Sequence, residues 1–150
     1  MRLRLTPFLL ASAIAATAFP ATAQEANPIV VRQNIMKSVG SAAGVGSGLL
    51  RKQIPFDEKS AGLVLATFSS AGHTFGDYFP DDSKEGNKTE AAPKIWEDKA
   101  GFDAEVKKFR DLADAAAGSK PSDLASFQKA FVGIAASCKS CHEGYRVSIN

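Results

Sequence analysis

PSDLASFQKAFVGIAASCKSCHEGYRV, residues 121–147, carries the most regular helical pattern in the chain. Its apolar and cysteine positions alternate at steps of three and four residues, and they are Leu124, Phe127, Phe131, Ile134, Cys138, Cys141 and Tyr145. This spacing puts all of these side chains on one face of a helix that packs nearly parallel or antiparallel to its neighbours. We therefore predict a helix over this stretch, with both cysteines on its buried face.

Three earlier segments show related patterns. They cover, approximately, residues 28–50, 57–75 and 97–117. Pro28 suits an early helix position, and the acids Asp57 and Glu58 suit a helix N-terminus. A polar loop, residues 81–92, separates the second segment from the third, and no segment shows a convincing strand pattern. The sequence thus predicts an all-α protein, an antiparallel four-helix bundle around one core.

The N-terminus fits a secretory signal peptide. Two arginines precede an apolar run over residues 7–20, and small residues at positions 21–23 supply a cleavage site. The apolar run is too short to span a bilayer comfortably. We predict that residues 1–23 are removed on export and that residues 24–150 form one domain.

The chain that remains is electrically balanced. The whole sequence has 18 basic and 16 acidic residues, and the predicted signal peptide contains two arginines and no acid. Residues 24–150 therefore contain 16 of each sign, which gives no basic surface of the kind that binds nucleic acid. No later segment is long and apolar enough for a transmembrane helix. We expect neither nucleic-acid binding nor membrane insertion.

The two cysteines of the chain lie in Cys138-Lys139-Ser140-Cys141-His142, which is the C-x-x-C-H pattern of c-type haem attachment. Residues three apart on a helix share one face, so two thiols can reach the two vinyl groups of one porphyrin. The adjacent histidine can offer an imidazole nitrogen to the iron. We predict covalent haem c on Cys138 and Cys141, with its iron bound by His142.

Three other interpretations of these cysteines are weaker. A thioredoxin-like redox pair would need a preceding strand and a βαβ setting, which the sequence does not show. A structural zinc site would need His73 as its fourth ligand, at a separation that fits no usual zinc motif. A disulfide between residues three apart would close too small a loop to stabilise the fold much.

The chain also resembles a known family. Five stretches carry the resemblance, and they are residues 138–146 (CKSCHEGYR), 32–37 (RQNIMK), 55–57 (PFD), 79–80 (FP) and 93–96 (PKIW). They are similar to class II cytochromes c, which include the high-spin cytochromes c′ and their low-spin, methionine-ligated relatives. The resemblance implies a periplasmic haem protein built as a four-helix bundle. It also implies thioether bonds at Cys138 and Cys141 and a proximal iron ligand at His142.

The same resemblance places Met36 on the side of the haem opposite the proximal ligand. The polar loop and residues 93–96 look closer to the low-spin branch, in which a first-helix methionine binds iron. Met36 is the one methionine that remains after removal of the signal peptide. If its sulfur binds, the histidine and methionine ligands favour a raised potential and electron transfer. His73 is a weaker candidate for this sixth position.

Two other roles for Met36 stay open. It could pack over the iron without binding it, which leaves a five-coordinate site for small gases such as nitric oxide. It could also be an ordinary core methionine, since this side chain is a common gap filler.

Further residues are candidates for the haem pocket. Arg32 and Arg146 could each pair with a haem propionate or could be solvated. Phe127 and Phe131 could line the pocket, although core packing explains them equally well. Tyr145 is a further pocket candidate that is most simply a core residue. Trp96 fits a hydrophobic staple ahead of the third helical segment.

These residues favour a soluble electron carrier, whose partners would be redox proteins in the periplasm or at the membrane. A haem protein that binds nitric oxide or carbon monoxide is the second hypothesis, and a helical protein without haem is the third. The sequence shows no catalytic triad, glycine-rich phosphate loop or pair of carboxylates near the motif, so we do not expect an enzyme. A homodimer is a further candidate assembly.

Overall fold

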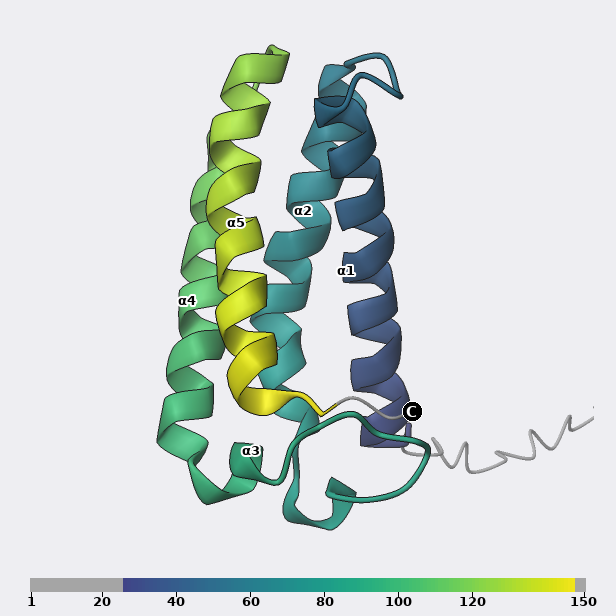
Figure 1. Ribbon diagram of the computed structural model, residues 1–150, viewed down its shortest axis with the longest axis vertical. Coiled ribbons are helices and arrows are strands. Elements are labelled where there is room, and N and C mark those ends of the chain that lie inside the picture. The colour runs from purple at the N-terminus through teal and green to yellow at the C-terminus, as the bar shows by residue number, and fades with distance from the viewer. Residues whose placement is uncertain (1–25, 148–150) are drawn as a thin grey trace, which may run out of the picture.

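The computed structural model describes residues 26–147, and Figure 1 shows its long helices side by side with alternating directions. In chain order they are α1 (Pro28–Leu50), α2 (Glu58–Thr74), α4 (Lys99–Gly118) and α5 (Leu124–Tyr145). The predicted all-α, antiparallel four-helix bundle is confirmed. Within residues 26–147, no helix has the length and apolar character needed to cross a membrane. The predicted signal peptide, residues 1–23, lies outside the described residues.

Side-chain caps fix where α2 and α5 begin. Asp57 Oδ2 accepts a hydrogen bond from Ser60 N at 2.8 Å, one turn into α2. Asp123 forms a capping box with Ser126, whose backbone N donates to Asp123 Oδ1 at 2.7 Å. Each cap satisfies amide groups that have no partner inside the helix and contributes about 1 kcal/mol. The helix predicted from residue 57 begins at Glu58, and the helix predicted over residues 121–147 begins three residues late, at Leu124.

The connection between α2 and α4 curves beneath the N-terminal end of α1 and the C-terminal end of α5 (Figure 1). It contains three short helical turns, η1 (Phe75–Tyr78), η2 (Asp81–Ser83) and α3 (Lys94–Glu97). The third predicted helix is interrupted near its start, because Asp98 leaves the helical conformation and its Oδ1 accepts from Gly101 N at 3.1 Å. Asp98 thus ends α3 and caps α4.

Two apolar clusters fill the bundle. The larger draws on all four long helices and contains the rings of Phe68, Phe127 and Phe131, with the centroid of Phe131 5.9 Å from Phe68 and 5.4 Å from Phe127. The smaller cluster joins the connection to α4 and α5, and its buried members are Phe79, Ile95, Phe102 and Tyr145. The buried face predicted for residues 121–147 is confirmed by Phe127, Phe131 and Ile134, which are at most 7% exposed.

Gly72 allows α2 and α4 to approach closely. A Cβ atom at this position would lie 2.8 Å from the Cα atom of Arg110 on α4, too close for two carbon atoms. Glycine in a helix interior costs about 1 kcal/mol relative to alanine. The close contact between the two helices offsets that cost.

Gly72→Ala is expected to lower the free energy of unfolding by about 1–3 kcal/mol, because the backbone of α4 would have to move. Gly62→Ala on the same helix is the matched control, since a Cβ atom there meets nothing within 4 Å. The control should raise stability by up to about 1 kcal/mol. Urea unfolding followed by circular dichroism measures both, and equal effects would contradict the proposed packing.

Candidate haem site

The two cysteine thiols lie at the junction of the two apolar clusters. Both are free and half-buried on the inward face of α5. Cys138 packs against the larger cluster, and Cys141 packs against the smaller one. The helical spacing therefore directs both thiols toward the interior at one end of the bundle, as the sequence predicted.

The surroundings keep these thiols neutral. Burial raises the pKa of Cys138. Burial also raises the pKa of Cys141 to about 11, and the negative charge of Glu105 adds to this effect. Reactive cysteines and zinc ligands are thiolates in electropositive surroundings, so this environment disfavours a thioredoxin-like pair.

A zinc site or a disulfide receives no support either. His73 lies on α2 with its Nε2 3.0 Å from Asp114 Oδ2 on α4, in a surface pair that also receives a hydrogen bond from Ser69. Within residues 26–147, no group of three or more His, Cys, Asp or Glu side chains is placed to hold a metal ion. The two thiols are unbonded to each other.

His142 follows Cys141 in the last two turns of α5 and is exposed. Partial desolvation lowers its pKa, and the positive charge of Arg146 adds to this shift while Glu90 opposes it. The imidazole is therefore neutral near pH 7, which is the form that binds a metal. Its backbone carbonyl accepts from Arg146 N at 3.3 Å, which closes the last turn of the helix.

Met36 and Phe131 face the same interior from opposite helices. Met36 is half-buried on α1 and packs against the larger cluster, which Cys138 on α5 also borders. Phe131 is 7% exposed and crosses from α5 to α1, where its ring lies so close to Gly46 that no side chain fits there. The structure thus places Phe131 in the core next to the region that the cysteines border.

The environment of Arg32 differs from the solvated one that was a predicted alternative. Arg32 is 3% exposed, so the solvated alternative is wrong. Its terminal N–H groups donate to oxygens of the connection between α2 and α4, at Tyr78, Ser83 and Thr89. A haem propionate would have to compete with these acceptors, and that contact stays a prediction.

Arg146 is paired with an acid that the sequence analysis did not single out. Its Nε forms an ion pair with Glu90, and Ala91 and Arg146 form an isolated antiparallel bridge. The side chain is half exposed. Both predicted alternatives, a propionate contact and a solvated side chain, therefore stay open for Arg146, which is exposed and paired with Glu90 at the surface.

Tyr145 and Trp96 belong to the smaller cluster. Tyr145 OH donates to Asp98 Oδ2 at 3.0 Å, and its ring lies 5.5 Å from that of Phe102. Trp96 Nε1 donates to Phe79 O at 3.1 Å and to Pro80 O at 3.2 Å. Trp96 therefore anchors the connection, and because it also packs against the cluster that contains Phe102 of α4, the hydrophobic staple stays a prediction.

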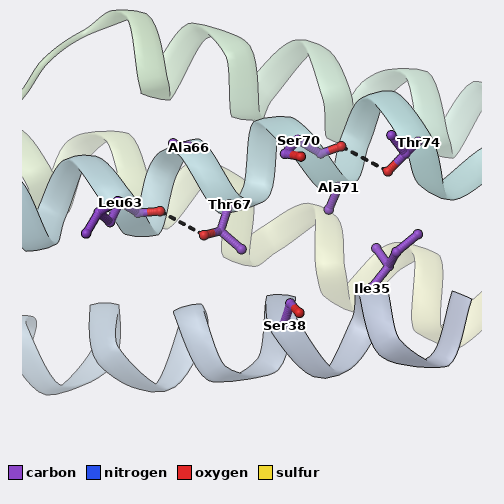
Figure 2. A pocket seen from close by; sticks show the side chains of 8 residues that line it. All are labelled: Ile35, Ser38, Leu63, Ala66, Thr67, Ser70, Ala71 and Thr74. Carbon is purple, nitrogen blue, oxygen red and sulfur yellow. Dashed lines mark hydrogen bonds between the residues drawn. The ribbon is translucent and has the colours of Figure 1, made fainter. Parts of the chain in front are cut away.

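A shallow groove lies elsewhere, between α1 and α2 (Figure 2). Its lining residues are Ile35, Ser38, Leu63, Ala66, Thr67, Ser70, Ala71 and Thr74. Two hydroxyls in the groove bond back to their own helix, since Thr67 donates to Leu63 O and Thr74 donates to Ser70 O. None of the lining residues comes from α5, so this groove is distinct from the region that the cysteines border.

Comparison with known proteins identifies the family. A family model described as cytochrome C′ matches residues 27–146. The chain belongs to the cytochrome c′ family. Cytochrome c′ of Rhodopseudomonas palustris is 37% identical over 118 residues, which are 79% of this chain and 80% of that protein. Cytochrome c-556 of Agrobacterium fabrum is 32% identical over 122 residues, which are 81% and 82% of the two chains.

The fold agrees with this family as well. A solved structure of cytochrome c′ from Rhodopseudomonas palustris matches with a TM-score of 0.78 at 35% identity, covering 84% of this chain and 100% of that chain. The predicted resemblance to class II cytochromes c is thus confirmed. As a member of this family, the protein carries covalently bound haem c with its iron.

The residues on α5 fit this cofactor. Thioether bonds need two thiols about one helical turn apart beside an apolar space, and Cys138 and Cys141 meet both conditions. An axial ligand needs a neutral imidazole, which the surroundings of His142 favour. The donor set of the structure is therefore that of a c-type haem site.

Sequence reasoning missed Asp98, Glu90, Ser83 and Thr89 as residues that organise this end of the bundle. All four are ordinary polar residues in or beside the connection between α2 and α4. The only signal was the concentration of such residues in a long loop, which is uncommon in compact domains.

Tyr145→Phe is expected to reduce the free energy of unfolding by about 1 kcal/mol, because the hydrogen bond to Asp98 is lost. Tyr78, the other tyrosine of the chain, is the matched control, and Tyr78→Phe should change stability by less than about 0.5 kcal/mol. Urea unfolding measures both variants. A larger loss at Tyr78 than at Tyr145 would contradict the assigned role.

Proposed function

We propose that Cys138 and Cys141 attach the haem and that His142 is the proximal ligand of its iron. Three features support this assignment. The three residues form a complete C-x-x-C-H pattern, the thiols border the apolar interior, and the lowered pKa of His142 favours the neutral imidazole. No other cysteine of the chain could take their place.

We further propose that Met36 is the sixth ligand and that the protein is a soluble electron carrier. The observation that carries this proposal is the placement of Met36 on α1 and Cys138 on α5 against one apolar cluster. Met36 is also the only methionine within residues 26–147. Histidine and methionine ligands raise the potential of a haem and fill both axial positions, as in cytochromes that transfer electrons.

The protein's own residues prepare the site for this role. Bound haem supplies one-electron redox chemistry. The larger cluster, with Phe68, Phe127 and Phe131, keeps water away from the interior that Cys138 borders. His142 lies on a helix whose last turn is closed by a backbone hydrogen bond to Arg146, so its position is set by regular secondary structure.

A five-coordinate protein that binds nitric oxide or carbon monoxide is the alternative. The presence of cytochromes named c′ among the relatives supports it, and a half-buried Met36 that only packs against the cluster would leave an open position on the iron. Catalysis is not part of either proposal.

The proposed cellular location and partners follow from the proposed function. We propose that the protein is exported to the periplasm with removal of residues 1–23, and that it exchanges electrons with redox proteins there or at the membrane. The pattern of the N-terminal residues supports export. Homodimer formation stays a prediction.

The attachment proposal predicts a covalent adduct. The exported protein should exceed its polypeptide mass by one haem, and the double variant Cys138→Ser, Cys141→Ser should lose haem staining on a denaturing gel. Lys139→Ala is the matched control inside the motif, because this side chain is 79% exposed, and it should stain like the wild type. An exported polypeptide with no added mass would refute the assignment.

Met36→Ala is expected to convert a low-spin ferric haem to a high-spin one and to let the reduced protein bind carbon monoxide. Ile35→Ala is the control, because Ile35 packs against the same cluster without being a proposed ligand, and it should stay low-spin. Absorbance spectra with and without carbon monoxide give the result. An unchanged spectrum in Met36→Ala removes Met36 from the ligands and favours the alternative.

A further inference from the structure

We infer that Arg32 is a positioning residue for iron coordination, which acts through the strap, defined here as residues 78–92. In this inference Arg32 holds the strap to α1, the strap is bound to the end of α5, and Met36 is thereby kept at binding distance opposite His142. The inference rests on the proposed function, because it concerns the spacing of the two proposed iron ligands.

Arg32 binds the strap at three separate points. Its Nη1 donates to Tyr78 O at 3.0 Å and to Ser83 Oγ at 2.9 Å. Its Nη2 donates to Ser83 O at 2.8 Å and to Thr89 Oγ1 at 2.9 Å. The planar guanidinium can satisfy acceptors in several directions at once, which a lysine ammonium on a flexible stem cannot reproduce. The start, middle and later part of the strap therefore depend on one side chain.

Among the described residues, the positive charge of Arg32 has no carboxylate partner. The ion pairs formed within residues 26–147 leave Arg32 out. The guanidinium instead makes cation–π contacts with aromatic rings of the smaller cluster. The Arg32 Cζ atom lies 4.7 Å from the ring centroid of Phe79 and 5.7 Å from that of Trp96. Because removal of a charge from water is costly, the folded state requires that these contacts be complete.

The other end of the strap pairs with the chain that follows His142. Ala92 N donates to Tyr145 O at 3.0 Å, and Val147 N donates to Glu90 O at 2.9 Å. These two backbone hydrogen bonds run across an antiparallel bridge. The strap is thus fastened directly to the last turn of α5.

Aromatic packing provides a second connection between Arg32 on α1 and the last turn of α5. The ring of Phe79 lies under the guanidinium of Arg32 and 4.7 Å from the ring of Phe102. The ring of Phe102 in turn lies 5.5 Å from that of Tyr145. Both the backbone route and the aromatic route therefore start at Arg32 and end at Tyr145.

The two ends of this linkage flank the proposed ligands. Arg32 precedes Met36 by four residues, about one turn of α1, and Tyr145 follows His142 by three residues on α5. The contact of Phe131 with α1 lies farther along the bundle, whereas the strap passes beneath both helix ends (Figure 1). At the end where the iron would be bound, the strap contacts both α1, through Arg32, and the last turn of α5.

The test uses the haem-loaded protein and two substitutions. Arg32→Lys keeps the charge and loses the multiple hydrogen bonds, and Arg32→Met loses both. We expect both variants to gain high-spin ferric haem and, when reduced, to bind carbon monoxide at least about tenfold faster than the wild type. Hydrogen exchange at the backbone amides of Ser83 and Thr89 should also become faster, because these lie in the released strap.

Gly72→Ala serves as the control for stability, since it disturbs the contact of α2 with α4 and leaves the strap intact; its spin state should match that of the wild type. Arg32 variants that remain low-spin and inert to carbon monoxide would overturn the inference. A wild-type spectrum in Arg32→Lys with a changed one in Arg32→Met would also overturn it, because charge alone would then explain the effect.

Failure of the proposed function has a different signature, namely a wild-type protein that is itself high-spin, and this result would overturn both proposals.

If the Arg32 variants do not fold, Ser83→Ala and Thr89→Val carry the test, because each removes one acceptor of the guanidinium. They should shift spin state and carbon monoxide binding in the same direction by a smaller factor. Spectra identical to the wild type in both would overturn the inference.

Discussion

One face of α5 has to close the apolar core and also carry the two cysteines, and the rest of the structure follows from this constraint. Along its first turns the face is closed core, with Phe127 and Ile134 at most 1% exposed. Toward its C-terminal end the same face carries Cys138 and Cys141, which are only half-buried. The regular spacing of three and four residues continues throughout. The change from apolar rings to small thiols along one unbroken helix makes room for a bound group without a change of fold.

The connection between α2 and α4 shows why a polar loop can be well ordered. Its composition is that of a mobile segment, and Asn87 and Lys88 adopt positive φ angles of 46° and 51°, which non-glycine residues rarely do. The loop nevertheless supplies the acceptors that a buried guanidinium needs at Ser83 and Thr89. Loop and arginine stabilise each other, because each would leave unsatisfied polar groups without the other.

Local physics made the helices and the haem motif predictable from the sequence. The hydrophobic period, the acids Asp57 and Glu58 at a helix start, and the C-x-x-C-H spacing all depend on residues within a few positions of one another. The partners of Arg32 and Arg146 lie 46 to 57 positions away in the chain, and nothing local indicates them. The hydrogen-bond partners of Trp96 could not be predicted for the same reason, since they are backbone carbonyls that the fold alone brings near.

The pairing of Val147 with Glu90 has a practical consequence for work with this protein. Because this pairing holds Val147 beside the last turn of α5, a polyhistidine segment attached near it would bring competing imidazoles close to the proposed proximal ligand. The turns that join α1 to α2 and α4 to α5 lie at the far end of the bundle (Figure 1). Purification handles, fluorophores or surface attachments belong on that side, where they leave the optical spectrum of the cofactor undisturbed.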